Sequence, residues 1–483
     1  MSDVPPDAGD GGAGDGGDGE PSTGEPVLGI VASRADEASM HVHEHLLDLA
    51  DWTAREDGGR RAADGGGTYH TCPGAVCRTV EERHLETTDA ADRFDADLAA
   101  LLFVSRHAGE TGPLLTTHAT GNLGPAEHGG APNELATAAP GVVGPVLAGL
   151  ADAAPDGYDV SMECTHHGPS RVGCPSQFVE LGSGPEQWDD PAAARAVAAG
   201  ALAARGVDPT PERSVAVFGG GHYAPRATRI ARETDWGVGH VCADWGLSAV
   251  PDDATRRRVA AQAVRRSGAT RAVDDTDEGT GDAVTAALAD LEVPVVGERF
   301  LRETTGVPLP TVRAVEGALG TVADGVRYGD CGRTGATDAG ADAVADVAVV
   351  ALPPTLVETA AGVDPESAVE AVASTTVAHE TAEAGARPGD RVAVPAEDER
   401  GRAAVVDALL AVCERAYDVA RSGDVVVLTR SVFDPAAAAE AGVPEGPAFG
   451  RLADGEPVTV DGETVRPEDV RTTERTEIRL SGG

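Results

Sequence analysis

Short apolar runs alternate with amphipathic, Ala-rich segments along most of the chain. The apolar runs predict buried strands at residues 27–33, 98–105, 113–118, 158–164, 177–181, 213–218, 238–242 and 270–273. The amphipathic segments predict helices at residues 38–52, 191–205, 226–234 and 252–267. A Gly-rich surface loop is expected at residues 57–67. This alternation favours a three-layer α/β domain with a mostly parallel or mixed sheet.

Two segments that lack this pattern divide the chain. Residues 1–26 contain eight glycines and seven acidic residues but no aromatic residue, so we expect a disordered tail. Residues 329–342 are rich in Gly and Asp, as is typical of a linker. The main domain would then span residues 27–328, and residues 343–483 would form a smaller α/β or α+β extension. In that extension we expect strands at residues 344–352 and 424–429 and helices at 365–374 and 399–421.

The charge balance narrows the class of protein. Eighty acidic residues stand against 38 basic residues, a net charge of −42, and every basic residue is arginine. Because 41% of the residues are apolar, the chain can still bury a core, and we interpret the carboxylates as the surface of a folded halophilic protein. Screening over about 3 Å at 1 M salt removes most of the repulsion between such charges.

Several other classes of protein are disfavoured. No apolar run approaches the roughly 18–20 residues of a membrane span, and the N-terminus lacks the basic and apolar regions of a secretory signal. The seven scattered cysteines do not suggest a disulfide framework. We therefore expect a cytoplasmic monomer with no membrane partner.

Histidines gather at the predicted carboxyl ends of the strands. Twelve of the 13 histidines lie between His41 and His240. Five of them follow or end predicted strands, namely His107, His118, His166, His167 and His222. Catalytic groups and ligands collect at these strand ends in open α/β sheets. One such histidine could be an ordinary core residue, but five at one edge favour a functional site.

The densest chemistry lies in residues 163–169, Glu-Cys-Thr-His-His-Gly-Pro. Along an extended backbone, Glu163 can reach the same face as His167, whereas His166 points elsewhere. Imidazole and carboxylate ligands suit zinc, and three protein ligands with an open position would leave a water with a pKa near 7. The alternative is a hydrogen-bonded strand cap that holds no metal.

A run of three glycines, Gly219, Gly220 and Gly221, follows a predicted strand and precedes His222 and Tyr223. Glycine N–H groups can converge on an oxyanion, and His222 would supply acid–base chemistry beside them. The run matches neither a Walker loop nor the dinucleotide-binding fingerprint. The alternative is a tight structural turn, but the adjacent His-Tyr pair favours the functional interpretation.

Two other motifs look like metal sites but are poor candidates. His41, His43 and His45 lie on one predicted helix, where only His41 and His45 share a face, so a solvated helix surface is expected. Cys72 and Cys77 have the wrong spacing for a zinc ribbon and no second pair.

An arginine-rich helix opposes the general acidity. Residues 252–271 contain six arginines against two aspartates, usually the mark of a solvated face. Because arginine suits bidentate phosphate contact, this helix is also the best candidate for a nucleic-acid-facing patch. The candidate contacts are Arg256, Arg257, Arg258, Arg265 and Arg266.

Seven colinear motifs resemble one known family. They are ASMHVHEHLLD, FVSRHAGETG, LLTTHATGN, GGAPNELA, ECTHHGPS, FVELGSGPEQWDD and FGGGHYAPRAT, within about residues 27–300. Together they resemble the archaeal and plant type of D-aminoacyl-tRNA deacylase. The resemblance implies a phosphorylase/peptidyl-tRNA hydrolase-like α/β fold and zinc-dependent hydrolysis of the ester between a D-amino acid and tRNA. The matching positions are His107, His118, Asn122, Glu163, His166, His167, Glu180, His222 and Tyr223.

This resemblance makes D-aminoacyl-tRNA the expected partner and Zn²⁺ the expected cofactor. We hypothesise that the zinc ligands are His118, Glu163, His166 and His167. The hypothesised catalytic residues are His107, Gly220, Gly221, His222 and Tyr223. Two alternatives stay open. The histidines alone would suit another metal-dependent hydrolase, such as a peptidase or amidase, and the chain could also be a non-catalytic protein that binds tRNA.

Overall fold

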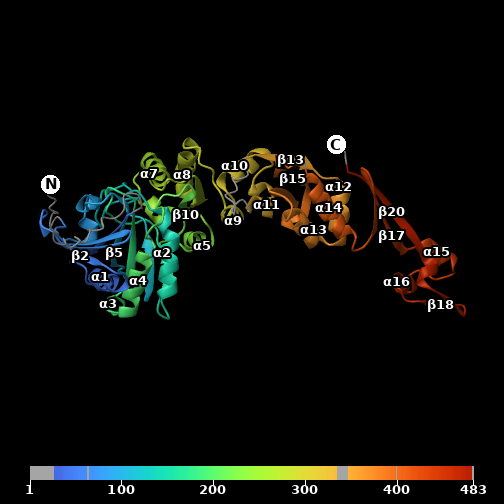
Figure 1. The fold of residues 1–483 in the computed structure, drawn as a ribbon, viewed down its shortest axis with the longest axis horizontal. Helices are drawn as coiled ribbons and strands as arrows, with labels where there is room; N and C mark the ends of the chain where they lie inside the picture. Colours follow the sequence, from blue (N-terminus) through green and yellow to red (C-terminus); the bar gives the residue numbers. More distant parts are fainter. Residues whose placement is uncertain (1–26, 63–64, 334–345, 399, 481–483) are drawn as a thin grey trace, which may run out of the picture. The chain divides into compact units, whose positions relative to one another are not determined.

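The computed structural model describes residues 27–62, 65–333, 346–398 and 400–480. They belong to two compact units, which divide between Glu298 and Arg299 (Figure 1). The tail expected at residues 1–26 and most of the linker expected at 329–342 lie outside the described residues. Among the described residues, no helix is both long and apolar enough to cross a membrane.

An eight-stranded mixed sheet organises the first unit. In spatial order its strands are β2 (Thr53–Asp57), β3 (Gly67–Cys72), β4 (Ala75–Val80), β1 (Val27–Ser33), β5 (Leu98–Arg106), β8 (Ser176–Gly182), β6 (Leu114–His118) and β7 (Asp159–Met162). The pairs β1–β4, β1–β5, β5–β8 and β6–β7 are parallel, whereas β2–β3, β3–β4 and β6–β8 are antiparallel. The α/β class and the mixed sheet are thus confirmed.

Alternate residues of the central strands fill two cores. Leu102 and Val104 of β5 pack with the helices α1 (Glu37–Leu49), α2 (Pro140–Ala153) and α4 (Pro191–Leu202) on one face (Figure 1). Leu101 and Phe103 point to the other face, which loop residues such as Phe94 and Val172 cover. Because both faces of β5 are buried, its sequence is almost continuously apolar, which is why the strand could be predicted.

A smaller parallel sheet completes the first unit. Its order is β10 (Gly237–Cys242), β9 (Ser214–Gly219), β11 (Arg271–Asp275), and α5 (Pro225–Glu233), α6 (Asp244–Ser248), α7 (Asp253–Arg266) and α8 (Glu278–Asp290) accompany it. A single antiparallel bridge pairs Glu163, just beyond β7, with Tyr223, just beyond β9. This bridge brings the loops that follow strands of the two sheets together.

Several elements of the first unit were not predicted. Helix α2 has three glycines and an internal Pro145 in its sequence PGVVGPVLAGLADA, so its helix propensity is weak. The packing of its valines and leucines stabilises it. Strands β2 and β3 are mostly polar and only partly buried, and they flank the loop expected at residues 57–67. Their apolar signal is therefore low.

The second unit contains an antiparallel sheet in the order β12 (Val326–Tyr328), β14 (Ala378–Ala382), β15 (Arg387–Pro395), β13 (Val347–Ala351). Its helices are α9 (Glu298–Glu303), α10 (Leu309–Ala318), α11 (Asp330–Arg333), α12 (Pro354–Val363), α13 (Pro365–Ala373) and α14 (Gly401–Cys413). Since β12 belongs to this sheet, the structural boundary precedes the linker that we expected at residues 329–342.

The chain ends in two small antiparallel sheets. One pairs β16 (Asp418–Ser422), β17 (Val425–Phe433) and β20 (Arg471–Arg479), and the other pairs β18 (Val458–Val460) with β19 (Glu463–Val465). Short helices α15 (Pro435–Glu440) and α16 (Pro447–Ala453) lie between them in sequence. The helix expected at residues 399–421 is wrong beyond Cys413, because the later residues form β16.

Two buried histidines, His240 and His84, stabilise the first unit through hydrogen bonds to the backbone. In His240, Nε2 lies 2.9 Å from the Ala136 carbonyl oxygen and Nδ1 lies 3.0 Å from Thr165 Oγ1. In His84, Nε2 lies 2.9 Å from the Val104 carbonyl oxygen. Burial lowers the pKa of each imidazole to about 4. Both rings are therefore neutral at pH 7 and act as hydrogen-bonding core residues.

These histidines predict a pH-dependent loss of stability. In the unfolded chain His240 is protonated below about pH 6.5, whereas in the folded protein it stays neutral down to about pH 4. Between these two pH values the free energy of unfolding therefore falls by about 1.4 kcal/mol for each pH unit that is lost. His240→Gln retains a side-chain N–H donor but removes the proton uptake. Urea unfolding in multi-molar KCl at pH 7, 6 and 5 should show a correspondingly shallower fall for this variant.

The solvent-exposed His128 provides the matched control, and His128→Gln should leave the slope unchanged. Parallel stability curves for wild type and His240→Gln would show that His240 does not resist protonation in the fold.

Candidate active site

The structure brings all five strand-end histidines into one cluster. His118 is the last residue of β6, His107 follows β5, and His222 follows β9. His166 and His167 lie in the loop after β7. Two buried carboxylates, Glu163 and Glu180, stand among these rings, as detailed below. The single carboxyl edge that we expected is wrong, because β6, which ends at His118, runs antiparallel to β8, whereas β5, which precedes His107, runs parallel to it. The bridge between Glu163 and Tyr223 brings the loops after β7 and β9 together beside them.

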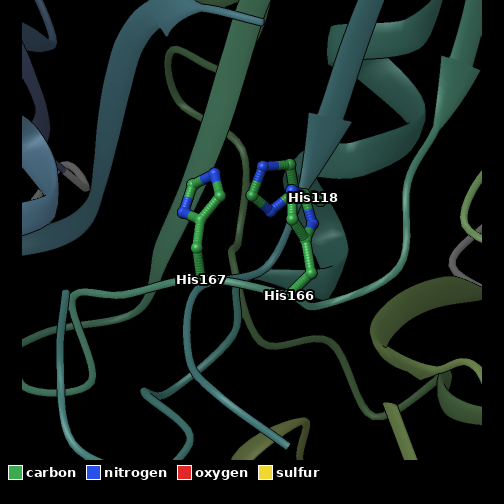
Figure 2. Close-up of side chains that lie close together, drawn as sticks. All are labelled: His118, His166 and His167. Atoms are coloured by element: carbon green, nitrogen blue, oxygen red, sulfur yellow. The ribbon is translucent and has the colours of Figure 1, made fainter. Parts of the chain in front are cut away.

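Three of the imidazoles form a compact group. The ring centroids of His118, His166 and His167 lie 4.4–4.7 Å apart, and Figure 2 shows the rings side by side. Each Nδ1 lies 2.8–3.0 Å from a backbone carbonyl oxygen, of Ala119, Cys164 and Gly168 respectively. A carbonyl only accepts, so each Nδ1 carries the proton, and in the neutral ring Nε2 keeps a free lone pair.

Glu180, on β8, supports this group from the sheet. Its Oε1 lies 3.6 Å from His118 Nε2 and 3.7 Å from His167 Nε2, and it accepts a 2.8 Å hydrogen bond from Ser105. Burial disfavours the charged carboxylate, but His118 and His167 outweigh it and hold the pKa of Glu180 well below its usual range. Burial likewise works to lower the pKa of His118, but Glu180 raises it above its ordinary value. Together these two pKa shifts favour a protonated His118 beside an ionised Glu180.

His166 differs from its two neighbours in charge preference. Burial, followed by the nearby rings of His167 and His118, holds the pKa of His166 well below its ordinary value. Its imidazole is therefore neutral at pH 7. A neutral imidazole with a free Nε2 is the form that binds a divalent metal ion.

Glu163 joins the three rings to the remaining histidines. Its fully buried carboxylate places Oε2 2.9 Å from His222 Nε2 and 3.8 Å from His166 Nε2, and Oε1 3.3 Å from His107 Nε2. Oε1 has no hydrogen-bond partner in the described part of the chain. The ligand atoms of His107, Glu163 and His222 lie within 4.8 Å of one another, as do those of His118, His166 and His167. Both sets could hold a metal ion.

A hydroxyl network that the sequence did not reveal orients His107. Ser183 Oγ lies 3.0 Å from His107 Nδ1 and 2.6 Å from Thr111 Oγ1. The Tyr223 hydroxyl approaches His107 Nε2 at 3.5 Å. Serines and threonines near a strand end are too common to single out, and only the fold shows which of them contact the histidines. Ser105, which donates a hydrogen bond to Glu180, could not be identified from the sequence for the same reason.

A cavity of about 560 Å³ adjoins this cluster, and His107, His166, His167, His222 and Glu180 line it, whereas His118 and Glu163 lie behind its lining. Its lining includes the buried His107 and Glu180, the half-buried His166, and the exposed Trp245. The site is therefore open to a ligand at one side and enclosed by the sheets at the other. Asn122, also singled out from the sequence, is buried and hydrogen-bonded to the Gly129 carbonyl, so it shapes a neighbouring loop.

The glycine run after β9 has a structural role in the backbone turn that follows this strand. Gly219 has a φ of 93°, and a Cβ there would lie 2.3 Å from the Asp275 carbonyl group. The Gly220 amide donates a 2.7 Å hydrogen bond to Asp244 Oδ2. This amide is therefore engaged, and the oxyanion-binding role that we expected for Gly220 does not fit the structure. A strained turn with close backbone approach accounts for Gly219.

The arginine-rich segment lies on α7, but its arginines are not equivalent. Arg256 is buried, donates a 2.9 Å hydrogen bond to the Leu247 carbonyl and pairs with Asp253, so it cannot contact a phosphate as we expected. Arg257 is exposed but pairs with Asp290. The exposed side chains that remain are Arg258, Arg265 and Arg266, of which the last donates to Thr137.

The motifs that looked like metal sites behave differently from each other. The rings of His41 and His45 lie side by side on α1, tilted at 45° with centroids 5.2 Å apart, whereas His43 is buried, with its ring 5.9 Å from that of His70. The expected solvated surface is therefore wrong for His43, whose pKa falls to about 4, mainly through burial. Cys72 and Cys77 lie on β3 and β4 as free thiols.

The glycine run offers a direct test of its structural role. Gly219→Ala should lower the free energy of unfolding by at least about 2 kcal/mol, because it combines a positive φ with a backbone clash. Gly221→Ala is the matched control, since a Cβ there meets no atom within 4 Å, and it should change stability by less than about 0.5 kcal/mol. Equal stabilities of the two variants in urea unfolding would refute the strained turn.

Comparisons with known proteins identify the family of this chain. Residues 94–296 match the family model described as D-aminoacyl-tRNA deacylase. A D-aminoacyl-tRNA deacylase of Natronomonas pharaonis is 47% identical over 93% of this chain and 99% of its own length. One of Halorubrum lacusprofundi is 46% identical over 93% and 96% of the two chains. Both relatives come from halophilic archaea.

A solved structure shows the same fold over part of the chain. It is a crystal structure of a conserved protein of unknown function, 27% identical, with a TM-score of 0.52. The match covers 58% of this chain and 98% of that one. With two relatives above 45% identity over nearly their full length, the chain belongs to the D-aminoacyl-tRNA deacylase family of hydrolases.

Proposed function

We propose that this site hydrolyses the ester of D-aminoacyl-tRNA with the help of a zinc ion, releasing the D-amino acid and tRNA. The observation that carries the proposal is the convergence of three imidazole Nε2 atoms beside the buried carboxylate of Glu163. Family membership supplies the reaction, and the geometry suggests which residues perform it.

The residues present fit a zinc ion. His118, His166 and His167 would hold it, because their Nδ1 atoms are bonded to carbonyls and their Nε2 lone pairs are free. His118 Nε2 is buried without a hydrogen-bond partner in the described structure, which a bound cation would relieve. Three imidazoles are a protein ligand set typical of catalytic zinc sites. When bound there, zinc supplies Lewis-acid chemistry that polarises a carbonyl and acidifies water.

Glu163 is the candidate proton carrier. As a water oxygen bonds to the ester carbonyl carbon, Glu163 accepts a proton from that water, and it returns a proton to the ribose oxygen when the carbon–oxygen bond breaks. His107 and His222, both in contact with the Glu163 carboxylate, would orient it and stabilise its charge. In the sequence hypothesis Glu163 was a zinc ligand, and its distance of 3.8 Å from His166 Nε2 leaves it close enough to act beside the metal instead.

Tyr223 and Gly221 are the candidate donors to the oxyanion. Burial raises the pKa of Tyr223, so its hydroxyl keeps its proton at neutral pH and can donate it in a hydrogen bond. This assignment replaces Gly220, whose amide is taken by Asp244. The exposed Arg258, Arg265 and Arg266 of α7 remain the proposed phosphate contacts of the tRNA.

The wider setting follows from the substrate. Because aminoacyl-tRNA is made and used where translation takes place, we place the protein in the cytoplasm. All proposed catalytic groups come from a single chain, which supports action as a monomer. We also assign the fold to the phosphorylase/peptidyl-tRNA hydrolase-like class, with the eight-stranded mixed sheet as support.

The proposal predicts chiral, metal-dependent deacylation. Purified protein in multi-molar KCl should release tyrosine from D-tyrosyl-tRNA much faster than from L-tyrosyl-tRNA. Dialysis against a chelator should abolish the release, and added zinc should restore it. Equal rates on the two substrates would contradict the D-specific function, and turnover unaffected by chelation would contradict the metal.

His167→Ala separates an enzyme from a tRNA-binding protein. Because the variant loses one proposed zinc ligand, hydrolysis should fall at least about 100-fold while the affinity for uncharged tRNA stays the same. Small amides and peptides should not be cleaved by the wild type. A variant that keeps full activity would exclude the three-histidine site, and cleavage of peptides would favour the broader hydrolase.

A further inference from the structure

Trp245 is unusual among the large apolar side chains of the described residues. It is 49% exposed, and Val295, at 53%, is the other large apolar side chain with comparable exposure. An exposed indole forgoes the stabilisation that its burial would give. Trp245 also lines the cavity that contains His166, His167 and His222. Its exposure therefore coincides with the active site.

The indole is held in place by its surroundings. Trp245 lies on the short helix α6, whose Gly246 packs so closely on Leu123 that a Cβ would come within 2.7 Å of it. The indole ring lies at 21° to the ring of His222, with centroids 6.0 Å apart. A flat, exposed ring in a fixed orientation is a stacking surface.

The chemistry of the substrate determines what could lie on this surface. The ester to be cleaved is attached to the ribose of the 3′-terminal nucleotide, so the terminal base is one sugar ring away from the reacting carbonyl. His222 links the two places, because it adjoins Trp245 on one side and lies 2.9 Å from Glu163 on the other. A nucleotide with its ester near Glu163 therefore has its base in reach of the indole.

The charge of the protein makes such a contact valuable. Concentrated salt screens the repulsion between the net charge of −42 and the tRNA phosphates, but it also screens the attraction that exposed arginines could offer. Base stacking on an aromatic ring does not depend on ion pairing. It thus keeps its strength in the solvent that the acidic composition suits.

We propose that Trp245 is a substrate-positioning residue on which the 3′-terminal adenine of the tRNA stacks, so that the neighbouring ester is placed at Glu163. This inference rests on the proposed function for the identity of the substrate. It adds a contact with the nucleotide that carries the ester, separate from the groups that perform the hydrolysis.

A binding cycle tests the contact without catalysis. Uncharged tRNA, intact or lacking its 3′-terminal adenosine, is titrated into wild type, Trp245→Ala and Trp245→Phe. Loss of the adenosine should weaken binding to wild type about 10- to 100-fold, the range for one stacked base, and should have little effect on Trp245→Ala. Trp245→Phe should keep most of the dependence, and the exposed Val295→Ala should keep all of it. Equal dependence on the adenosine in wild type and Trp245→Ala would overturn the proposal.

A kinetic comparison then separates positioning from a structural role. Trp245→Ala should raise KM for D-aminoacyl-tRNA about 10-fold or more and leave hydrolysis of a D-amino acid methyl ester, which has no base, unchanged. Equal loss on both substrates would mean that Trp245 supports the catalytic groups and would overturn the proposal. If wild type fails to deacylate tRNA but the binding cycle still shows coupling, the proposed function falls and the stacking contact stands.

Discussion

The free energy of burying two carboxylates governs the whole site. Glu163 is fully buried and Glu180 is 2% exposed, and an isolated buried carboxylate would cost several kcal/mol or would take up a proton. Imidazoles approach the oxygens of both residues, and Ser105 donates to Glu180. Buried imidazoles and carboxylates are also the ligands through which a bound cation would stabilise the folded state.

The division of labour between the carboxylates follows from their positions. Glu180 lies on strand β8, is bonded to Ser105 and is directed at His118 and His167, so it orients the rings that would hold the metal. Glu163 lies in the loop after β7 with one oxygen unbonded among the described residues. Glu180 is therefore held in place by the sheet, whereas Glu163 has a carboxylate oxygen available for proton transfer. This contrast is a consequence of the strand ending between Met162 and Glu163.

The histidines that form the site could be identified from the sequence, but their place in the sheet and the detail of their contacts could not. Buried strands such as β5 and β8 have continuous apolar signals, and the histidines that follow strands could be read directly. Helix α2 and the polar strands β2 and β3 depend on tertiary packing and left weak signals. His43 was mistaken for a solvated residue because the ring that it contacts, His70, is remote in sequence. Arg256 was mistaken for a surface residue because the fold of the preceding turn, which turns the Leu247 carbonyl toward it, could not be predicted. The Gly220 amide, likewise, is engaged by an aspartate 24 positions later.

The central claim is that His118, His166 and His167 bind one zinc ion through their Nε2 atoms. Diffraction from crystals of the zinc-loaded protein, recorded on both sides of the zinc absorption edge, tests it most directly. We expect an anomalous peak in bonding contact with all three Nε2 atoms and adjoining Glu163. A peak held by other residues, or crystals of active protein with no zinc between these rings, would contradict it.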